Sequence, residues 1–127
     1  MGGGRLLRRD RGSVTVEFFL VVPLLIVVLA AGIQVISVAR TRIELLGAVR
    51  EGARVAATTP DPAKAVTAVR DALAPNQRDR VRISVSRPGV VGRPARVTAT
   101  YRHSLPVPVI DDLSFDIRVS ASMLVER

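Results

Sequence analysis

Cysteine and tryptophan are absent from this 127-residue chain, and histidine occurs once, at position 103. The lack of cysteine excludes disulfide bonds, thiolate catalysis and zinc sites built from cysteine. With His103 as the only histidine, the chain has neither a histidine pair for a metal nor a spare base for a catalytic triad. We therefore expect no cofactor, no metal site, no small-molecule substrate and no enzymatic activity.

Two further patterns also fall short of a binding site. Asp111 and Asp112 are adjacent, but the series of oxygen ligands that a calcium loop requires is missing around them, so a turn or cap is expected there. The glycines at positions 2–4 and between 89 and 92 lack the lysine and the strand–helix context of a phosphate-binding loop.

Aromatic residues make up only 3% of the chain, although its formal net charge is +8. Lys64 is the only lysine, so the positive charge comes almost entirely from arginines, which are scattered along the sequence. Proteins that bind nucleic acid combine a clustered basic surface with aromatic side chains that stack on bases. Neither feature is present here, and we expect no nucleic-acid partner.

An uncharged apolar segment extends from Phe18 to Ala39, with Gln34 and Ser37 as its main polar residues. As a helix it would be about 33 Å long, enough to cross the hydrocarbon core of a bilayer. We predict a single transmembrane helix, in which Pro23 removes one backbone hydrogen bond and kinks or loosens the helix. Arginines flank the segment in similar numbers on both sides, so the positive-inside rule does not orient it.

Glu17 directly precedes this segment, where an unpaired carboxylate is costly. One interpretation is a cap, because acidic side chains in a first helical turn interact favourably with the helix dipole. In another, the chain is cut between Gly12 and Ser13, which places Glu17 on the same helix face as the new amino group of Ser13. A third treats the segment as a signal peptide cleaved after residues 28–30.

Three elements of the sequence match a known pattern. They are Gly12-Ser13-Val14-Thr15-Val16-Glu17-Phe18, then Val22-Pro23-Leu24-Leu25, then Arg50-Glu51-Gly52-Ala53-Arg54 followed by Ala56 and Ala57. With this combination, residues 12–57 resemble the TadE-like family, the pseudopilins of the tight-adherence (Flp) pilus assembly apparatus. The first element by itself resembles a type IV prepilin processing site.

The resemblance implies that a prepilin peptidase cleaves after Gly12, that the N-terminus is cytoplasmic, and that Glu17 acts in assembly. The expected partners are the peptidase, other pseudopilins, the membrane platform of the pilus machine and the cytoplasmic membrane itself. Two alternatives stay open. One is a small secreted binding domain released by signal peptidase, and the other is a membrane-anchored interaction module unrelated to pili.

The first helix is expected to continue beyond the membrane to Thr58, because no proline interrupts it and apolar residues recur at the helical period. These apolar positions are Ile36, Ile43, Leu46, Val49, Ala53 and Ala57. Small residues in the same stretch would let a helix or a sheet approach closely; they are Gly47, Gly52, Ala53, Ala56 and Ala57.

Beyond residue 59 the sequence predicts a helix over about residues 62–74, capped by Asp61, with Val66, Val69 and Leu73 on its buried face. Alternating residues then predict strands near 81–86, 96–101 and 115–123, whereas the prolines of segment 105–108 exclude a central strand there. The expected fold is α+β and pilin-like, with a small antiparallel sheet of about three strands. We divide the chain into a leader (1–12), a transmembrane and extended helix (13–58) and an extracytoplasmic domain (59–127).

Overall fold

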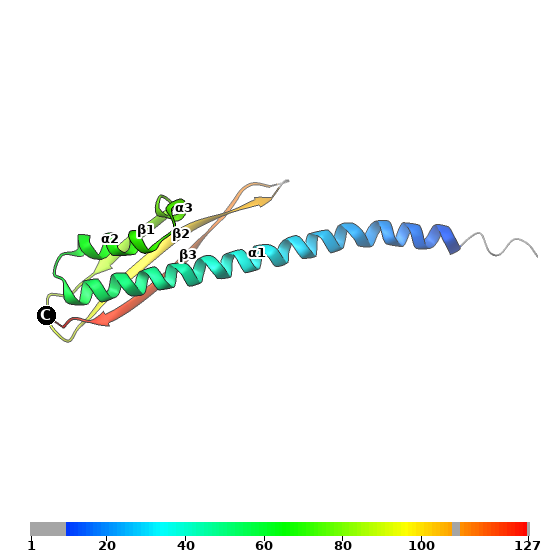
Figure 1. Cartoon of the computed structure of the whole chain (residues 1–127). Coiled ribbons are helices and arrows are strands. Elements are labelled where there is room, and N and C mark those ends of the chain that lie inside the picture. The colour runs from blue at the N-terminus through cyan, green and yellow to red at the C-terminus, as the bar shows by residue number, and fades with distance from the viewer. Residues whose placement is uncertain (1–9, 108–109, 127) are drawn as a thin grey trace, which may run out of the picture. The chain divides into compact units, whose positions relative to one another are not determined.

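The computed structural model describes residues 10–107 and 110–126, with side chains described for 14–106 and 113–126. Over these residues the element order is α1 (Asp10–Thr58), α2 (Pro62–Ala72), α3 (Pro75–Arg78), β1 (Val81–Ser86), β2 (Pro94–Val107) and β3 (Ile110–Leu124) (Figure 1). This order confirms the predicted α+β class. The chain divides into two units, Met1–Ser37 and Val38–Arg127, whose boundary falls inside α1.

Helix α1 is a single helix of 49 residues that continues through Pro23. It ends at Thr58, just before Thr59-Pro60, where proline disfavours further helix. The predicted continuation of the first helix from the apolar segment to Thr58 is therefore confirmed.

The start of α2 also follows the prediction. Asp61 is the N-cap, its carboxylate accepts a hydrogen bond from the backbone N–H of Ala63 at 2.9 Å, and Pro62 occupies the first helical position. The helix ends at Ala72, two residues earlier than expected. The short helix α3 that follows begins at a proline and was not predicted.

The three strands form one antiparallel sheet in the order β1-β2-β3. Val81 pairs with Tyr101 across the first ladder, and Tyr101 pairs with Ile117 across the second. All three of these side chains are buried, so the sheet has one covered face. The predicted alternation is confirmed in the middle of the sheet, but Phe115 and Met123 of β3, which it places on the covered face, are exposed.

The proline segment near residue 106 lies in a strand, but not in a central position. Strand β2 continues through Pro106, while its pairing with β1 ends at Tyr101. Beyond that point β2 pairs only with β3, and the register shifts between Leu105 and Val107. Proline is tolerated there because the strand is an edge. The turn expected at Asp111 and Asp112 is wrong, since both lie within β3.

The core lies between the sheet and two helices, α2 and the C-terminal part of α1. Its buried members are Leu45, Ala48, Val49, Ala53, Ala56, Ala65, Val69, Leu73, Val81, Ala95, Val97, Ala99, Tyr101, Ile117, Val119 and Val125. The apolar positions of α1 do not all lie on its buried face, because Ile36 and Ile43 are 70% and 71% exposed while Leu45 is fully buried. Position 43 is about 200° around the helix from position 45, so the two side chains cannot share a face.

Candidate functional site

The N-terminal part of α1 is covered with exposed apolar side chains. Phe18 and Phe19 are 70% and 79% exposed, and the large apolar residues from Leu20 to Ile36 are also exposed, except for the half-buried Val22. From Val14 onward, α1 is long and apolar enough to cross a membrane by length and composition. An exposed apolar surface of this extent is unsuited to water and suited to lipid, consistent with a single-pass membrane protein.

The predicted processing site lies in the same helix. The backbone of Gly12 and Ser13 is helical, while their side chains are outside the described set. The Glu17 side chain is exposed and has no hydrogen bond or ion pair with any residue whose side chain is described. Because α1 starts at Asp10, Glu17 lies about two turns inside it, and the dipole effect fades within the first turn. The cap interpretation therefore does not fit the uncleaved chain.

The Arg50–Arg54 element has an inner face formed by Gly52 and Ala53, both buried. A Cβ atom placed on Gly52 would overlap Val69 Cγ2 of α2 and would lie 3.3 Å from the Ala65 carbonyl oxygen. It would also lie 3.5 Å from Val97 Cγ1 of β2. Gly52 is thus a point of close approach between α1, α2 and the sheet, as the small-residue pattern predicted.

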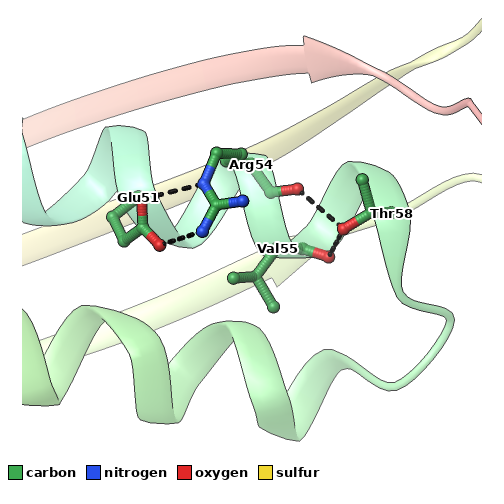
Figure 2. Close-up of polar contacts among 4 residues, drawn as sticks. All are labelled: Glu51, Arg54, Val55 and Thr58. Carbon is green, nitrogen blue, oxygen red and sulfur yellow. Dashed lines mark hydrogen bonds and ion pairs between the residues drawn. The ribbon is translucent and has the colours of Figure 1, made fainter.

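The outer face of the same element carries its charges. Arg54 donates from Nε to Glu51 Oε2 at 3.0 Å and from its second terminal nitrogen to Glu51 Oε1 at 2.5 Å (Figure 2). This hydrogen bonding lowers the pKa of the Glu51 carboxyl and raises the pKa of Arg54. Arg50 is exposed and makes no ion pair with the side chains that the structure describes. The two outward arginines therefore differ, since only Arg54 is held in place.

The end of α1 carries hydrogen bonds that the sequence did not predict, both within the helix and from the segments that follow β1 and β3. The Thr58 hydroxyl donates to the carbonyl oxygens of Arg54 and Val55, at 3.2 and 3.3 Å (Figure 2). Arg87 Nε donates to the Ala56 carbonyl oxygen at 2.8 Å, and the Glu126 backbone N–H donates to Ala57 at 3.2 Å. The last carbonyl groups of a helix lack hydrogen-bond partners within the helix, so these bonds supply donors to carbonyl oxygens at the end of α1. No local pattern marks Arg87, which is 31 residues away from Ala56.

Gly12, Glu17, Pro23 and the Arg50–Arg54 element therefore all lie along one helix, the first part apolar and exposed and the second packed on the sheet. A family model described as TadE-like protein matches residues 12–54. These residues are TadE-like. The resemblance is thereby confirmed over about a third of the chain. No curated protein and no solved structure matches the chain.

The TadE-like segment, residues 12–54, contains the residues that the sequence singled out for processing and assembly and the whole family pattern except Ala56 and Ala57. The match supports an involvement with the tight-adherence pilus machinery. Within the part of the chain that the structure describes, no group of three or more His, Asp or Glu residues could hold a metal ion.

Proposed function

We propose that this chain is a membrane-anchored, pseudopilin-type component of the tight-adherence pilus assembly or secretion machinery. A prepilin peptidase cuts between Gly12 and Ser13, and the TadE-like segment then anchors the mature chain in the cytoplasmic membrane. The domain formed by residues 59–127 lies on the extracytoplasmic side. In this role the chain is a substrate of an enzyme and not an enzyme itself.

The observation that carries the proposal is the TadE-like match itself, which begins at residue 12 and runs through the apolar part of α1 into the Arg50–Arg54 element. The fold supports it in two ways. The exposed apolar side chains from Val14 onward need a lipid or protein environment. The remainder of α1 packs on a small antiparallel sheet, which gives an anchored chain a compact domain to present to partners.

The proposed partners are the peptidase, other pseudopilins and the membrane platform protein of the same machine. Glu17 is the proposed contact for docking beside other transmembrane helices. An exposed carboxylate at the edge of the apolar segment is stabilised when it meets an opposite charge. Arg50 is a second candidate contact, because it has no ion pair with a described side chain of its own chain.

The N-terminal residue of the membrane-extracted protein tests the processing step. In cells that contain the prepilin peptidase, the mature chain is expected to begin at Ser13. Gly12→Leu should retain the leader and show the intact mass, while Gly4→Leu, a change at another leader glycine, should be processed normally. An N-terminus at Ala31 would instead support release by signal peptidase, and one at Met1 or Gly2 would support an unprocessed anchor.

The orientation can be tested directly because the chain contains no cysteine. A single cysteine placed at Ser84 of β1, which is exposed, should react with a membrane-impermeant maleimide added to spheroplasts. A cysteine at Gly4 should react only after the membrane is permeabilised, measured in the Gly12→Leu background so that the leader is retained. The opposite labelling pattern would place the domain in the cytoplasm and overturn the proposed orientation.

A further inference from the structure

The face of the sheet opposite the helices carries arginine, serine and threonine side chains. An open pocket of about 320 Å³ is lined by Asp79, Arg80, Val81, Arg82, Arg102, Ser104 and Ser114. A smaller pocket of about 90 Å³ adjoins it and shares the same three arginines with Thr100 and Asp116. Three arginines and two serines therefore line one depression, which we call the arginine pocket.

The arginines of this pocket are weakly compensated. Arg102 Nε lies 3.9 Å from Asp116 Oδ1, and both side chains are largely exposed. Arg80 and Arg82 make no side-chain hydrogen bond or ion pair with any residue whose side chain is described. Among the side chains that the structure describes, Asp79 is the only acidic one that lines the larger pocket. Guanidinium groups bind phosphate oxygens through paired N–H donors, and hydroxyl groups add further donors. The chemistry of the pocket thus fits a phosphate.

The arginine pocket is connected to α1 through two hydrogen bonds. Gln77 Nε2 of α3 donates to Glu44 Oε2 of α1 at 2.7 Å, and the Arg80 backbone N–H donates to the Gln77 carbonyl oxygen at 3.1 Å. The start of β1 is therefore tied to α1 at Glu44. Residue 44 is only about 6 Å along the helix from Arg40, the first charged residue after the apolar segment. Arg40 and Arg42 are also exposed.

The link to Glu44 indicates which phosphate groups lie near the arginine pocket. When the apolar segment ends at the membrane surface, Arg40 and Arg42 lie among the lipid headgroups, and the arginine pocket is attached about one helical turn further on. Basic residues close to a membrane surface are attracted to anionic lipids. An acidic protein partner would also fit the charge, but the short separation along α1 between Glu44 and Arg40 favours a lipid.

We propose that the arginine pocket binds the phosphate of an anionic phospholipid through Arg80, Arg82 and Arg102. The bound headgroup holds the arginine pocket against the membrane that α1 enters. This inference rests on the proposed membrane insertion of residues 18–39 and does not depend on cleavage at Gly12 or on the pilus machinery.

The test uses the full chain reconstituted in bilayer nanodiscs that contain phosphatidylglycerol and phosphatidylcholine, and native mass spectrometry to count the lipids that stay bound. Wild type is expected to retain phosphatidylglycerol in preference to phosphatidylcholine. The combined variant Arg80→Gln, Arg82→Gln, Arg102→Gln should lose this preference by about two orders of magnitude at low ionic strength, since each arginine near an anionic surface contributes roughly fivefold.

A second combined variant, Lys64→Gln, Arg70→Gln, Arg93→Gln, is the matched control. It removes the same charge from exposed positions that do not line the pocket, so it should keep the wild-type preference. Circular dichroism of both variants verifies that the domain is folded. Equal loss in both variants, or no loss in either, would overturn the proposal. Displacement of the lipid by excess inorganic phosphate at constant ionic strength would assign the pocket to a free anion and likewise overturn it.

A different result distinguishes failure of this inference from failure of the proposed membrane anchor. If the wild-type chain is recovered in the soluble fraction, the anchor itself is wrong. The other outcome is that the wild-type chain stays in the membrane, while the pocket variant binds phosphatidylglycerol normally but no longer co-purifies with an acidic protein. That result would support the membrane anchor and contradict the assignment of the pocket to a lipid.

Discussion

Gly52 of α1 and Val69 of α2 lie so close together that a methyl group at position 52 would overlap Val69 Cγ2. Val69 is fully buried, and its branched side chain has little freedom to turn away. The Ala65 carbonyl oxygen, 3.3 Å from the same point, limits movement in a second direction. Part of the Arg50–Arg54 element is therefore explained by packing within the chain and needs no partner.

Gly52→Ala is expected to destabilise the folded domain by about 1–3 kcal/mol, the usual cost of inserting a methyl group into a well-packed core. The measurement is thermal unfolding of the full chain in detergent. Gly47→Ala is the matched control, because Gly47 lies in the same helix with nothing within 4 Å of its added Cβ. That change should stabilise the domain by about 0.5–1 kcal/mol, the usual helix preference of alanine over glycine.

The overlap with Val69 predicts a coupling between the two positions. Val69→Ala removes the Cγ2 atom, so Gly52→Ala should cost less in that background than in the wild type. The two penalties would simply add if the Ala65 carbonyl oxygen, and not Val69, were the main obstacle. A Gly52→Ala protein as stable as the wild type would contradict the close approach itself.

Arg87→Leu is expected to destabilise the domain by about 1–2 kcal/mol, because it removes a charged donor from the Ala56 carbonyl at the negative end of α1. Arg87→Lys keeps the charge near the helix end and should recover part of the loss. Arg93→Gln removes an exposed arginine from the neighbouring loop and should leave the thermal midpoint unchanged. Equal midpoints for Arg87→Leu and Arg93→Gln would show that the bond to Ala56 contributes nothing.

The sequence predicted the elements whose signals are local. Asp61-Pro62 marks the start of α2 through a cap and a fixed backbone angle, and the alternation in β1 and β3 gives their covered face. The buried face of α1 was harder, because the large side chain of Ile43 points outward while alanines and Gly52 point inward. A hydrophobicity pattern points to the face with the largest apolar side chains, whereas close packing here requires small residues on the buried face.

The candidate site likewise has features that local sequence patterns predicted and features that they did not. The elements that contain Gly12, Pro23 and Gly52 could be recognised from their spacing along the chain, and the TadE-like match covers them. The contacts of Arg87 with Ala56 and of Gln77 with Glu44 join residues 31 and 33 positions apart. Such contacts depend on how the helices and sheet pack, which no local pattern encodes. The arginine pocket was missed for the same reason, since its arginines are scattered in the sequence and converge only through strand register.

Glu51→Gln is expected to leave stability almost unchanged, because the Glu51–Arg54 pair is exposed and weakened by solvent. Its small effect has a defined pH dependence. The hydrogen bond from Arg54 lowers the pKa of Glu51 in the folded chain, so the pair stabilises the fold at neutral pH. That contribution is lost as the pH falls through the folded-state pKa. The difference in melting temperature between wild type and Glu51→Gln should therefore vanish in acid, and a difference that grows in acid would contradict the pairing.

Glu17→Gln is expected to leave cleavage intact and to reduce incorporation into the pilus assembly machinery. Cleavage after Gly12 gives Ser13 a free amino group, and the Glu17 carboxylate lies four residues further along the same helix face. Near the membrane interface, a carboxylate that meets this amine, in its own chain or in a neighbour, offsets part of its desolvation cost. Glutamine keeps the shape of the Glu17 side chain but has no charge with which to pair with the amine.

The role of Glu17 depends on cleavage, and this dependence gives the sharpest test. In the Gly12→Leu background no amino group forms at Ser13, so adding Glu17→Gln should cause no further loss of assembly. In the cleavable chain, N-terminal sequencing should find Ser13 in both wild type and Glu17→Gln, while co-purification with the other pilus components should fall only for the variant. Normal co-purification of the Glu17→Gln variant would show that the carboxylate has no role in assembly. An additional loss in the uncleaved background would show that Glu17 acts without the amine, through a contact with another chain.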